Sequence, residues 1–272
     1  MTKQTNRLQT NIILFLLIVV VGLTIALVFT LRELKTRPVP EEILPPKPAP
    51  PVVGIIALII DDFGYRNDAV SDGFLALKTP LTFSIIPGHE YSQSFAKEAH
   101  AKGHEVIVHM PMETNTPTYG EEEYIVGPSQ TSQEIEQRVK KALQLINGSA
   151  GMNNHQGSRA TADKRVMTIV GGVLKDLGKY FIDSRTTTKT VAETTMRKLG
   201  VPTGRRHVFL DNDNDPDLIR LQLDELAEKA RQKGVAIGVG HARKNTLKVI
   251  QEAIPELEQE GYQFVFVSQV VN

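Results

Sequence analysis

The sequence predicts an α/β protein, a complete or distorted (β/α) barrel preceded by one transmembrane helix. Three observations carry this prediction: an uncharged apolar segment near the N-terminus, a proline-rich stretch after it, and an alternation of short apolar runs with amphipathic segments in the remaining chain. We divide the 272 residues into a cytoplasmic tail and membrane anchor at 1–36, a linker at 37–53 and a domain at 54–272. A domain of roughly 220 residues has the size of a single α/β barrel.

The apolar segment runs from Ile12 to Leu31 without a charged residue, and its 20 residues can span a bilayer as a helix. A cleavable signal peptide has a shorter apolar core and a small-residue cleavage site, and no convincing site precedes Arg32. We therefore expect an uncleaved anchor, with a cleaved signal as the alternative. Basic residues flank the segment on both sides, so the positive-inside rule does not decide its orientation.

The linker contains seven prolines between Arg37 and Pro51. Such a composition favours extended polyproline II structure and predicts a semi-rigid spacer. The alternative is a disordered leader without a spacing role.

Eight short apolar runs of the domain predict parallel strands, with seven helical stretches between them. An open doubly wound sheet would show the same alternation and differ in strand order, which the sequence does not show. The predicted strands are Gly54–Ile60, Leu81–Ile86, Val106–Val108, Gly151–Asn154, Tyr180–Ile182, Val208–Leu210, Val235–Val239 and Phe264–Val267.

Two helices carry clear start and stop signals. Thr131 with Glu134 predicts a capping box, and the pair Asn147–Gly148 ends that helix. The pair Asp215–Pro216 supplies an N-cap and a first-position proline for another helix, which Gly234 ends.

Composition excludes several classes of partner and chemistry. Lysines plus arginines number 31, aspartates plus glutamates also number 31, and no long basic run follows residue 53, so nucleic acid is not an expected partner. There is no cysteine, which excludes disulfides, thiolate metal sites and a cysteine nucleophile. Any metal must be bound by His, Asp or Glu.

The stretch His104–Glu113 places a histidine at the end of an apolar run and a glutamate four residues later. If Val106–Val108 is a buried strand, Pro111 can begin a helical turn, because a first helical position needs no backbone N–H. Residues i and i+4 of one turn lie on the same side, so His109 and Glu113 are expected to face one point with the spacing of metal ligands.

Polar residues follow the predicted strands where each of them ends. The carboxyl ends of parallel strands meet at one rim in both candidate architectures, so these side chains are expected to converge. Each alone has a structural explanation; Asp211, for example, begins the acidic turn 211–215. The set comprises Asp61, Asp62, His89, His109, His155, Asp183, Ser184, Arg185, Asp211, His241 and Arg243.

This combination predicts a metal-dependent hydrolase. Neutral imidazoles with one or two carboxylates suit Zn²⁺ or another divalent first-row metal, and an open coordination position leaves room for water. Zinc lowers the pKa of bound water to about 7 and polarises a carbonyl. Asp61 and Asp62 together supply one carboxylate for the metal and one for a general base, while a histidine across the site can protonate a leaving group.

Several motifs resemble a known family. Ile59–Asp62, Gly103–His109 and Gly240–His241 resemble the first, second and last motifs of the polysaccharide deacetylases, also called the NodB homology family. Adding Asn153–Gly157, Phe181–Arg185 and Gly238–Arg243, the ordered pattern resembles the divergent polysaccharide deacetylase branch over about residues 54–270.

The resemblance implies a distorted (β/α) barrel of the polysaccharide deacetylase type and a site with assigned roles. Asp61 is then the base, Asp62 and His109 bind the metal, and His241 is the catalytic histidine. Family members usually act outside the cytoplasm. We therefore expect a single-pass protein of the inner membrane, with the domain on the periplasmic side and an acetylated polysaccharide as its substrate.

The chain departs from the family's pattern at defined places. Glu113 stands where the second metal histidine is usual, and a carboxylate can replace imidazole as a zinc ligand. Asn153 and His155 stand where the third motif has arginine and proline, which makes His155 an extra or replacement ligand. His241 lacks the acidic neighbour that often follows it. Asp183 is expected to hold His241 or the catalytic water, or else to cap a turn or pair with Arg185.

Three functions are weighed. The first is hydrolysis of N- or O-acetyl groups on an envelope or extracellular polysaccharide. The second is a weakly active or inactive barrel that binds glycan or an envelope protein. A phosphoryl-transfer enzyme with Asp61 as nucleophile is disfavoured, because such hydrolases usually separate two aspartates by one residue. A complete set of base, metal ligands and acid favours the first.

Overall fold

A computed structural model describes residues 2–36, 51–116 and 120–272, and the chain divides into two compact units, Met1–Ala49 and Pro50–Asn272. The predicted proline-rich spacer falls largely on residues 37–50, which lie outside the described residues.

The first unit contains helix α1 (Thr2–Thr36), which includes the predicted membrane span. From Ile12 to Lys35 this helix is long and apolar enough to cross a membrane, with a mean hydropathy of 3.3, and its apolar window is not buried within the protein. A helix that is apolar on all sides needs a protein core or lipid around it. It is a candidate membrane span, by properties that a signal sequence shares.

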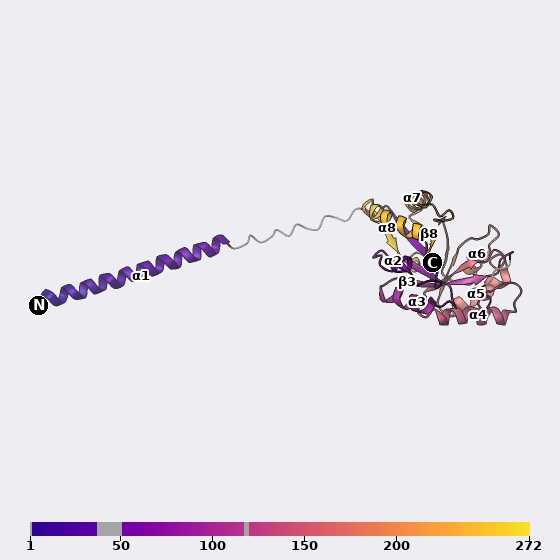
Figure 1. Ribbon diagram of the computed structural model, residues 1–272, viewed down its shortest axis with the longest axis horizontal. Coiled ribbons are helices and arrows are strands. Elements are labelled where there is room, and N and C mark those ends of the chain that lie inside the picture. Colours follow the sequence, from indigo (N-terminus) through magenta and orange to yellow (C-terminus); the bar gives the residue numbers. More distant parts are fainter. Residues whose placement is uncertain (1, 37–50, 117–119) are drawn as a thin grey trace. The chain divides into compact units, whose positions relative to one another are not determined.

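The second unit is built on one sheet, in which the structure describes nine strands and parallel ladders between them (Figure 1). The strands are β1 (Gly54–Phe63), β2 (Thr82–Ile85), β3 (Glu105–Met112), β4 (Gly151–Gln156), β5 (Tyr180–Asp183), β6 (Thr203–Arg205), β7 (Val208–Phe209), β8 (Val235–His241) and β9 (Tyr262–Val265).

The strand order is that of a barrel left open at one point. It runs β6-β5-β4-β3-β2-β1-β8-β7, and β9 pairs with the first half of β1. No ladder joins β6 to β7 in the described part of the chain. The pairing of β1 with β8 is the closure that a barrel requires, whereas a doubly wound sheet reverses its strand order at a switch point. The predicted distorted (β/α) barrel is confirmed.

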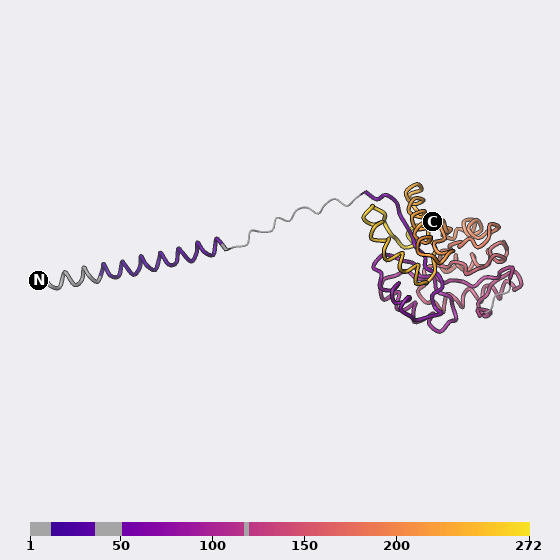
Figure 2. The backbone as a smooth tube through the Cα atoms, turned by 45° about the horizontal axis from the view of Figure 1, so that its top comes forward, coloured from indigo at the N-terminus to yellow at the C-terminus, as the bar shows by residue number. Residues whose placement is uncertain are grey.

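Helices follow the strands in alternation, and the unit forms one compact body (Figure 2). They are α2 (Ala69–Leu75), α3 (Ser92–Ala101), α4 (Ser132–Leu145), α5 (Lys164–Asp176), α6 (Ala192–Leu199), α7 (Pro216–Lys233) and α8 (Lys244–Gln259).

The predicted caps of two helices are confirmed. The Thr131 side chain accepts from the backbone of Glu134, and the Glu134 carboxylate accepts from the backbone of Thr131, so α4 begins with a capping box. Asp215 caps the start of α7, where Pro216 is the first residue, and Gly234 ends it with a positive φ of 83°.

Two strand predictions need correction. β6 was missed because its three residues contain no apolar run. β3 continues through Pro111 to Met112, so the predicted helical turn at Pro111 is wrong. Pro111 lies opposite His155 of β4, and the chain stays extended across the stretch that separates His109 from Glu113.

The pleat of the strands divides the core into two clusters. On β1, Ile56, Leu58 and Ile60 belong to the larger cluster, which also contains the buried residues of the helices. Ala57 and Ile59 point the other way, into a smaller cluster formed by buried residues of five strands and of the chain after β9. Successive side chains of a strand face opposite sides, so the smaller cluster marks the inside of the barrel.

We predict that residues 53–272 fold without the anchor. The sheet and its covering helices lie in this stretch, and the compact unit begins at Pro50. The purified fragment should be monodisperse and unfold in one cooperative transition on heating, followed by circular dichroism. Persistent aggregation without a thermal transition would contradict the boundary.

Candidate metal centre

The alternation of the strands places the site residues on the inner face. Asp61 continues the inward series of Ala57 and Ile59 on β1, and His109 follows Ile107 on β3 in the same way. The register then brings residues of different strands together: Asp61 lies beside His241 of β8, and His109 lies beside Asn153 of β4.

Asp62 reaches the same point by a different route. Its φ of 70° is in the left-handed region, which interrupts the alternation directly after Asp61. Gln156 and Arg185 are the other described non-glycine residues with positive φ, and they lie at the ends of β4 and β5. Such conformations cost free energy and gather at functional sites, so their position at one rim marks this end of the barrel.

Asp62, His109 and His155 form a group that fits a metal ion. Asp62 Oδ1 lies 3.4 Å from His109 Nε2 and 3.3 Å from His155 Nδ1, and the two imidazole nitrogens lie 3.1 Å apart. A tetrahedral metal with bonds of about 2.1 Å holds its ligand atoms about 3.4 Å apart. Asp62 Oδ1 is buried without a hydrogen-bond partner, and a cation would satisfy it.

Asn153 connects the carboxylate of Asp61 to the imidazole of His109. Its Nδ2 donates to Asp61 Oδ1 at 2.8 Å, and its Oδ1 accepts from Ser84 Oγ and from His109 Nδ1, both at 2.6 Å. His109 therefore carries its proton on Nδ1, which directs the Nε2 lone pair at the metal group. Asn153 is fully buried, and its bonds fix both side chains.

The charges of the group shift its pKa values. Burial raises the pKa of Asp62, but the adjacent imidazoles of His109 and His155 outweigh it and hold that pKa well below its usual range. Burial lowers the pKa of His109, yet Asp61 and Asp62 together raise it to about 8. A divalent cation bound by Asp62 and His109 would displace the proton that these groups hold.

His241 is oriented by Asp211, which lies directly after β7. His241 Nδ1 donates to Asp211 Oδ1 at 2.8 Å, while the backbone of His241 and the hydroxyl of Thr246 donate to Asp211 Oδ2. Burial lowers the pKa of His241, but Asp211 and the aspartates of β1 outweigh it and raise the pKa. The remaining nitrogen, Nε2, lies 3.8 Å from Asp62 Oδ2.

The structure does not bring Glu113 to the metal group. An extended strand rises about 3.3 Å per residue, so Glu113 lies roughly 13 Å along the chain from His109 instead of one helical turn away. Its carboxylate pairs with Arg159 and accepts from Ser129 Oγ at 3.0 Å. Of the two alternatives for the third ligand, the geometry favours His155.

Asp183 also lies away from His241, contrary to the predicted positioning role. It follows Ile182, an inner residue, so the alternation turns its side chain outward. One oxygen accepts from the backbone of Arg185 at 2.8 Å and the other from Thr190 Oγ1 at 2.8 Å. Asp183 therefore caps a turn, as its alternative interpretation predicted. Asp211, and not Asp183, is the carboxylate that orients His241.

His89, another predicted rim residue, belongs to a neighbouring cluster. Its ring packs against that of Tyr65 in a tilted arrangement with 4.1 Å between centroids, and its Nε2 lies 3.6 Å from Glu121 Oε1. The Tyr65 hydroxyl donates to the same oxygen at 2.5 Å.

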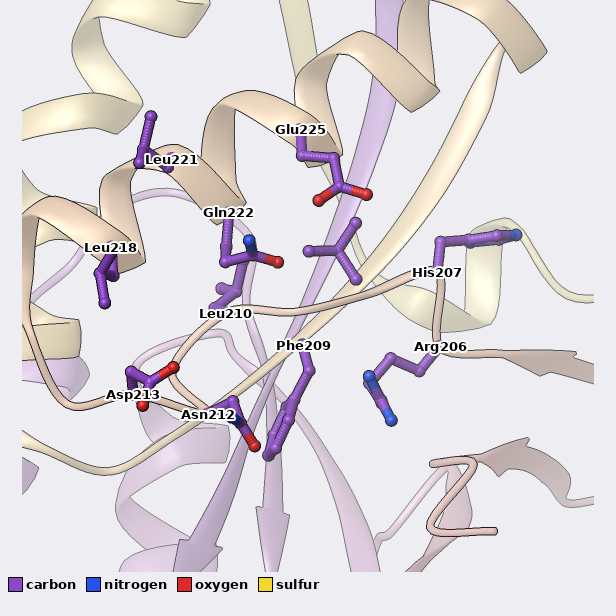
Figure 3. Close-up of a pocket in the computed structure, with 11 residues that line it drawn as sticks. Arg206, His207, Phe209, Leu210, Asn212, Asp213, Leu218, Leu221, Gln222 and Glu225 are labelled. Carbon is purple, nitrogen blue, oxygen red and sulfur yellow. The ribbon is translucent and has the colours of Figure 1, made fainter. Parts of the chain in front are cut away.

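Two pockets open at this end of the barrel. The first has a volume of about 390 Å³ and is lined by Asp61, His109, His155 and His241 together with Arg185 and Arg206. The second, of about 550 Å³, lies beside it and shares Arg206, Phe209 and Asn212 with it. Figure 3 shows this second pocket between the chain around Phe209 and the helix that carries Leu218, Leu221 and Gln222. Of these two pockets, His109 and His155 of the candidate metal group line the first and not the second.

Fold and site together define a parallel (β/α) half-barrel of the polysaccharide deacetylase type, with a His/Asp group at the carboxyl ends of its strands. The chain belongs to the divergent polysaccharide deacetylase family, whose sequence pattern matches residues 58–271.

Relatives share the sequence or the fold. An uncharacterized Haemophilus influenzae protein is 34% identical over 208 residues, which cover 75% of this chain and 72% of that protein. The crystal structure of the uncharacterized Agrobacterium tumefaciens protein ATU2773 matches with a TM-score of 0.73 at 21% identity, over 83% of this chain and 92% of that one. A Bacillus anthracis protein described as a CE4 family pseudoenzyme matches with a TM-score of 0.53 at 15% identity, over 79% of this chain and 64% of that one.

The metal content of two variants tests whether His109 binds the metal and Glu113 does not. We expect His109→Ala to remove nearly all bound metal, because it deletes a ligand atom central to the group. Glu113→Gln should keep stoichiometric metal, because its carboxylate is paired with Arg159. The metal content of both purified full-length variants, measured by mass spectrometry, checks this. Full metal in His109→Ala, or loss of metal in Glu113→Gln, would overturn the ligand assignment.

Proposed function

We propose that this protein is a membrane-anchored, metal-dependent carbohydrate deacetylase that hydrolyses N- or O-acetyl groups of an envelope or extracellular polysaccharide. The observation that carries the proposal is the spacing of Asp62 Oδ1, His109 Nε2 and His155 Nδ1, each between 3.1 and 3.4 Å from the next. Three protein ligands leave a coordination position open, which is the arrangement of catalytic zinc sites. Zn²⁺ is the metal we propose.

When bound, the metal polarises the acetyl carbonyl and lowers the pKa of water. Asp61 accepts the proton of the attacking water. Its Oδ1 is held by Asn153 at 2.8 Å, so Oδ2, 3.7 Å from His109 Nε2, is the oxygen that faces the group. Asp61 is 3% exposed, and a buried carboxylate in a fixed position needs little reorganisation to act as a general base.

His241 delivers a proton to the departing amine or alcohol. Asp211 Oδ1 accepts a hydrogen bond from His241 Nδ1 at 2.8 Å, which turns Nε2 toward the pocket. Because Asp211 raises the pKa of His241, the imidazole keeps its second proton into a higher pH range. Base and acid come from neighbouring strands, with Asp61 and His241 as paired positions of β1 and β8.

The anchor gives the proposed location. The candidate span of α1 supports a single-pass protein of the inner membrane, and the family's substrates support a domain on the periplasmic side. The domain would then bind its polysaccharide substrate at the membrane surface or farther out in the envelope.

The second candidate is a barrel that binds glycan or an envelope protein without catalysis. Glu113 of the second motif region is paired with Arg159 instead of facing the metal group, and Asn153 replaces the family's arginine beside Asp61. Acetate release by the metal-loaded full-length protein in detergent, measured on acetylated envelope glycans, decides between the two. No release from any acetylated glycan would favour the binding function.

Substitution of the base and the acid tests their roles. We expect Asp61→Asn to keep the metal and lower kcat/KM by about 10² to 10⁴, the usual contribution of a general acid or base. His241→Ala should reduce hydrolysis of acetamides more than that of acetate esters, because a departing amine depends more on protonation. Steady-state rates on a matched amide and ester check both. Wild-type turnover in Asp61→Asn would refute the mechanism.

Asp211 and Asp183 should respond differently to the same change. Asp211→Asn removes the charge that holds His241, so kcat should fall about 10- to 100-fold. The alkaline limb of its pH profile should move to lower pH, since His241 then loses its proton earlier. Asp183→Asn serves as the matched control with near-normal kcat. An unshifted profile in Asp211→Asn, or a shifted one in the control, would contradict this assignment.

A further inference from the structure

Two arginines line the metal pocket without an acidic partner. Arg185 and Arg206 both face the 390 Å³ pocket that contains Asp61, His109 and His241. Neither forms an ion pair with a carboxylate in the part of the chain that the structure describes. Six other arginines of the domain do form such pairs: Arg66, Arg159, Arg197, Arg205, Arg220 and Arg231.

Arg206 is fixed in position before any ligand arrives. Its Nε donates to the carbonyl of Ser184 at 2.7 Å and its Nη2 to that of Arg185 at 3.2 Å. The guanidinium also lies over the ring of Phe209, with 4.6 Å to the centroid. Figure 3 shows Phe209 between Arg206 and Asn212. These contacts occupy one edge and one face of the guanidinium, and Nη1 has no hydrogen-bond partner among the described residues.

Arg185 is presented by a strained backbone. Its φ of 53° lies in the left-handed region, and its N–H donates to Asp183 Oδ1 at 2.8 Å, which holds that turn. The side chain has no hydrogen-bond or ion-pair partner within residues 51–116 and 120–272. Burial is the main reason that the pKa of Arg206 lies below its usual value; Asp61 and Asp183 raise this pKa, and the positive charge of Arg185 lowers it, so the two guanidinium groups repel each other.

The charge balance of the pocket favours an anion. The carboxylates of Asp61 and Asp62 offset the charge of a divalent cation, and Asp183 is outward and engaged as a turn cap. Asp61 and Asp183 attract Arg206, but no carboxylate among the described residues lies within ion-pair distance of Arg185 or Arg206. The second pocket carries Asp213 and Glu225, so an acidic group is better placed on the metal side of Arg206.

We infer that Arg185 and Arg206 bind a carboxylate substituent of the glycan, so that this protein selects an acidic sugar at or next to the acetylated residue. The inference rests on the proposed function for its substrate class, and it narrows that class from polysaccharides in general to carboxylate-bearing ones. A planar guanidinium matches a carboxylate with two parallel hydrogen bonds, which a neutral hydroxyl does not offer.

Binding of sugars without acetyl groups tests this separately from catalysis. The full-length protein in detergent is titrated by calorimetry with cellotetraose and with its tetra-acid, in which every C6 hydroxyl is oxidised to a carboxylate. We expect the tetra-acid to bind about ten- to a hundredfold more tightly, the range that charge-assisted hydrogen bonds provide. Arg206→Gln and Arg185→Gln should each lose most of this preference.

Arg205→Gln is the matched control, because Arg205 is adjacent in sequence but pairs with Glu193 outside the pocket. It should keep the preference of the wild type. Arg185→Gln keeps the test valid if Arg206→Gln does not fold. Equal affinity for both sugars, or a preference that survives in the folded pocket variants or disappears equally in Arg205→Gln, would overturn the inference. Acetate release from a neutral glycan without any preference for acidic sugars would overturn this inference and leave the proposed function intact. Selective binding of the acidic sugar without acetate release would refute the proposed function and leave this inference intact.

Discussion

The two-residue alternation of the parallel strands is the constraint on which the site depends. Along β1 and β3 it sends one series of side chains to the helices and the other into the barrel, and the inner series ends in Asp61 and His109. A shift of one residue in either strand would bury these polar groups against the helices. The same hydrophobic pattern that stabilises the fold therefore also fixes which charges meet at the rim.

Buried hydrogen bonds then convert this convergence into a defined geometry. Asn153 and Asp211 touch no proposed reacting atom, yet each sets the proton position of one imidazole, Asn153 for His109 and Asp211 for His241. Both are fully buried, where an unsatisfied polar group is costly and a satisfied one is rigid. Asp61 is bound into the same network through Asn153, so base and metal ligand share one support.

The sequence could predict the elements and the rim, because apolar periodicity, helix caps and strand-end polar residues are local signals. It could not predict partners that depend on register and pleat. Asp183 ends a strand as clearly as Asp61 does, but its side chain lies on the outer face of β5. Asp211 was predicted at the rim, with an acidic turn as its alternative, but its hydrogen bond to His241 depends on the register between strands. Arg206 follows β6, a strand of three residues with no apolar run, so Arg206 was not recognised as a residue at a strand end.

The extended conformation of β3 beyond His109 explains why His155, and not Glu113, completes the candidate metal group. A helical turn after His109 would have used Glu113, but an extended β3 moves that residue away from the rim, where it pairs with Arg159. The same extension aligns Pro111 with His155 on β4, two pairs beyond His109 and Asn153. Side chains two apart on a strand face one side, so lengthening β3 and β4 together supports an imidazole beside His109. The third residue of the candidate metal group thus comes from an adjacent strand instead of the sequence neighbourhood of His109, and the pairing of β3 with β4 places it there.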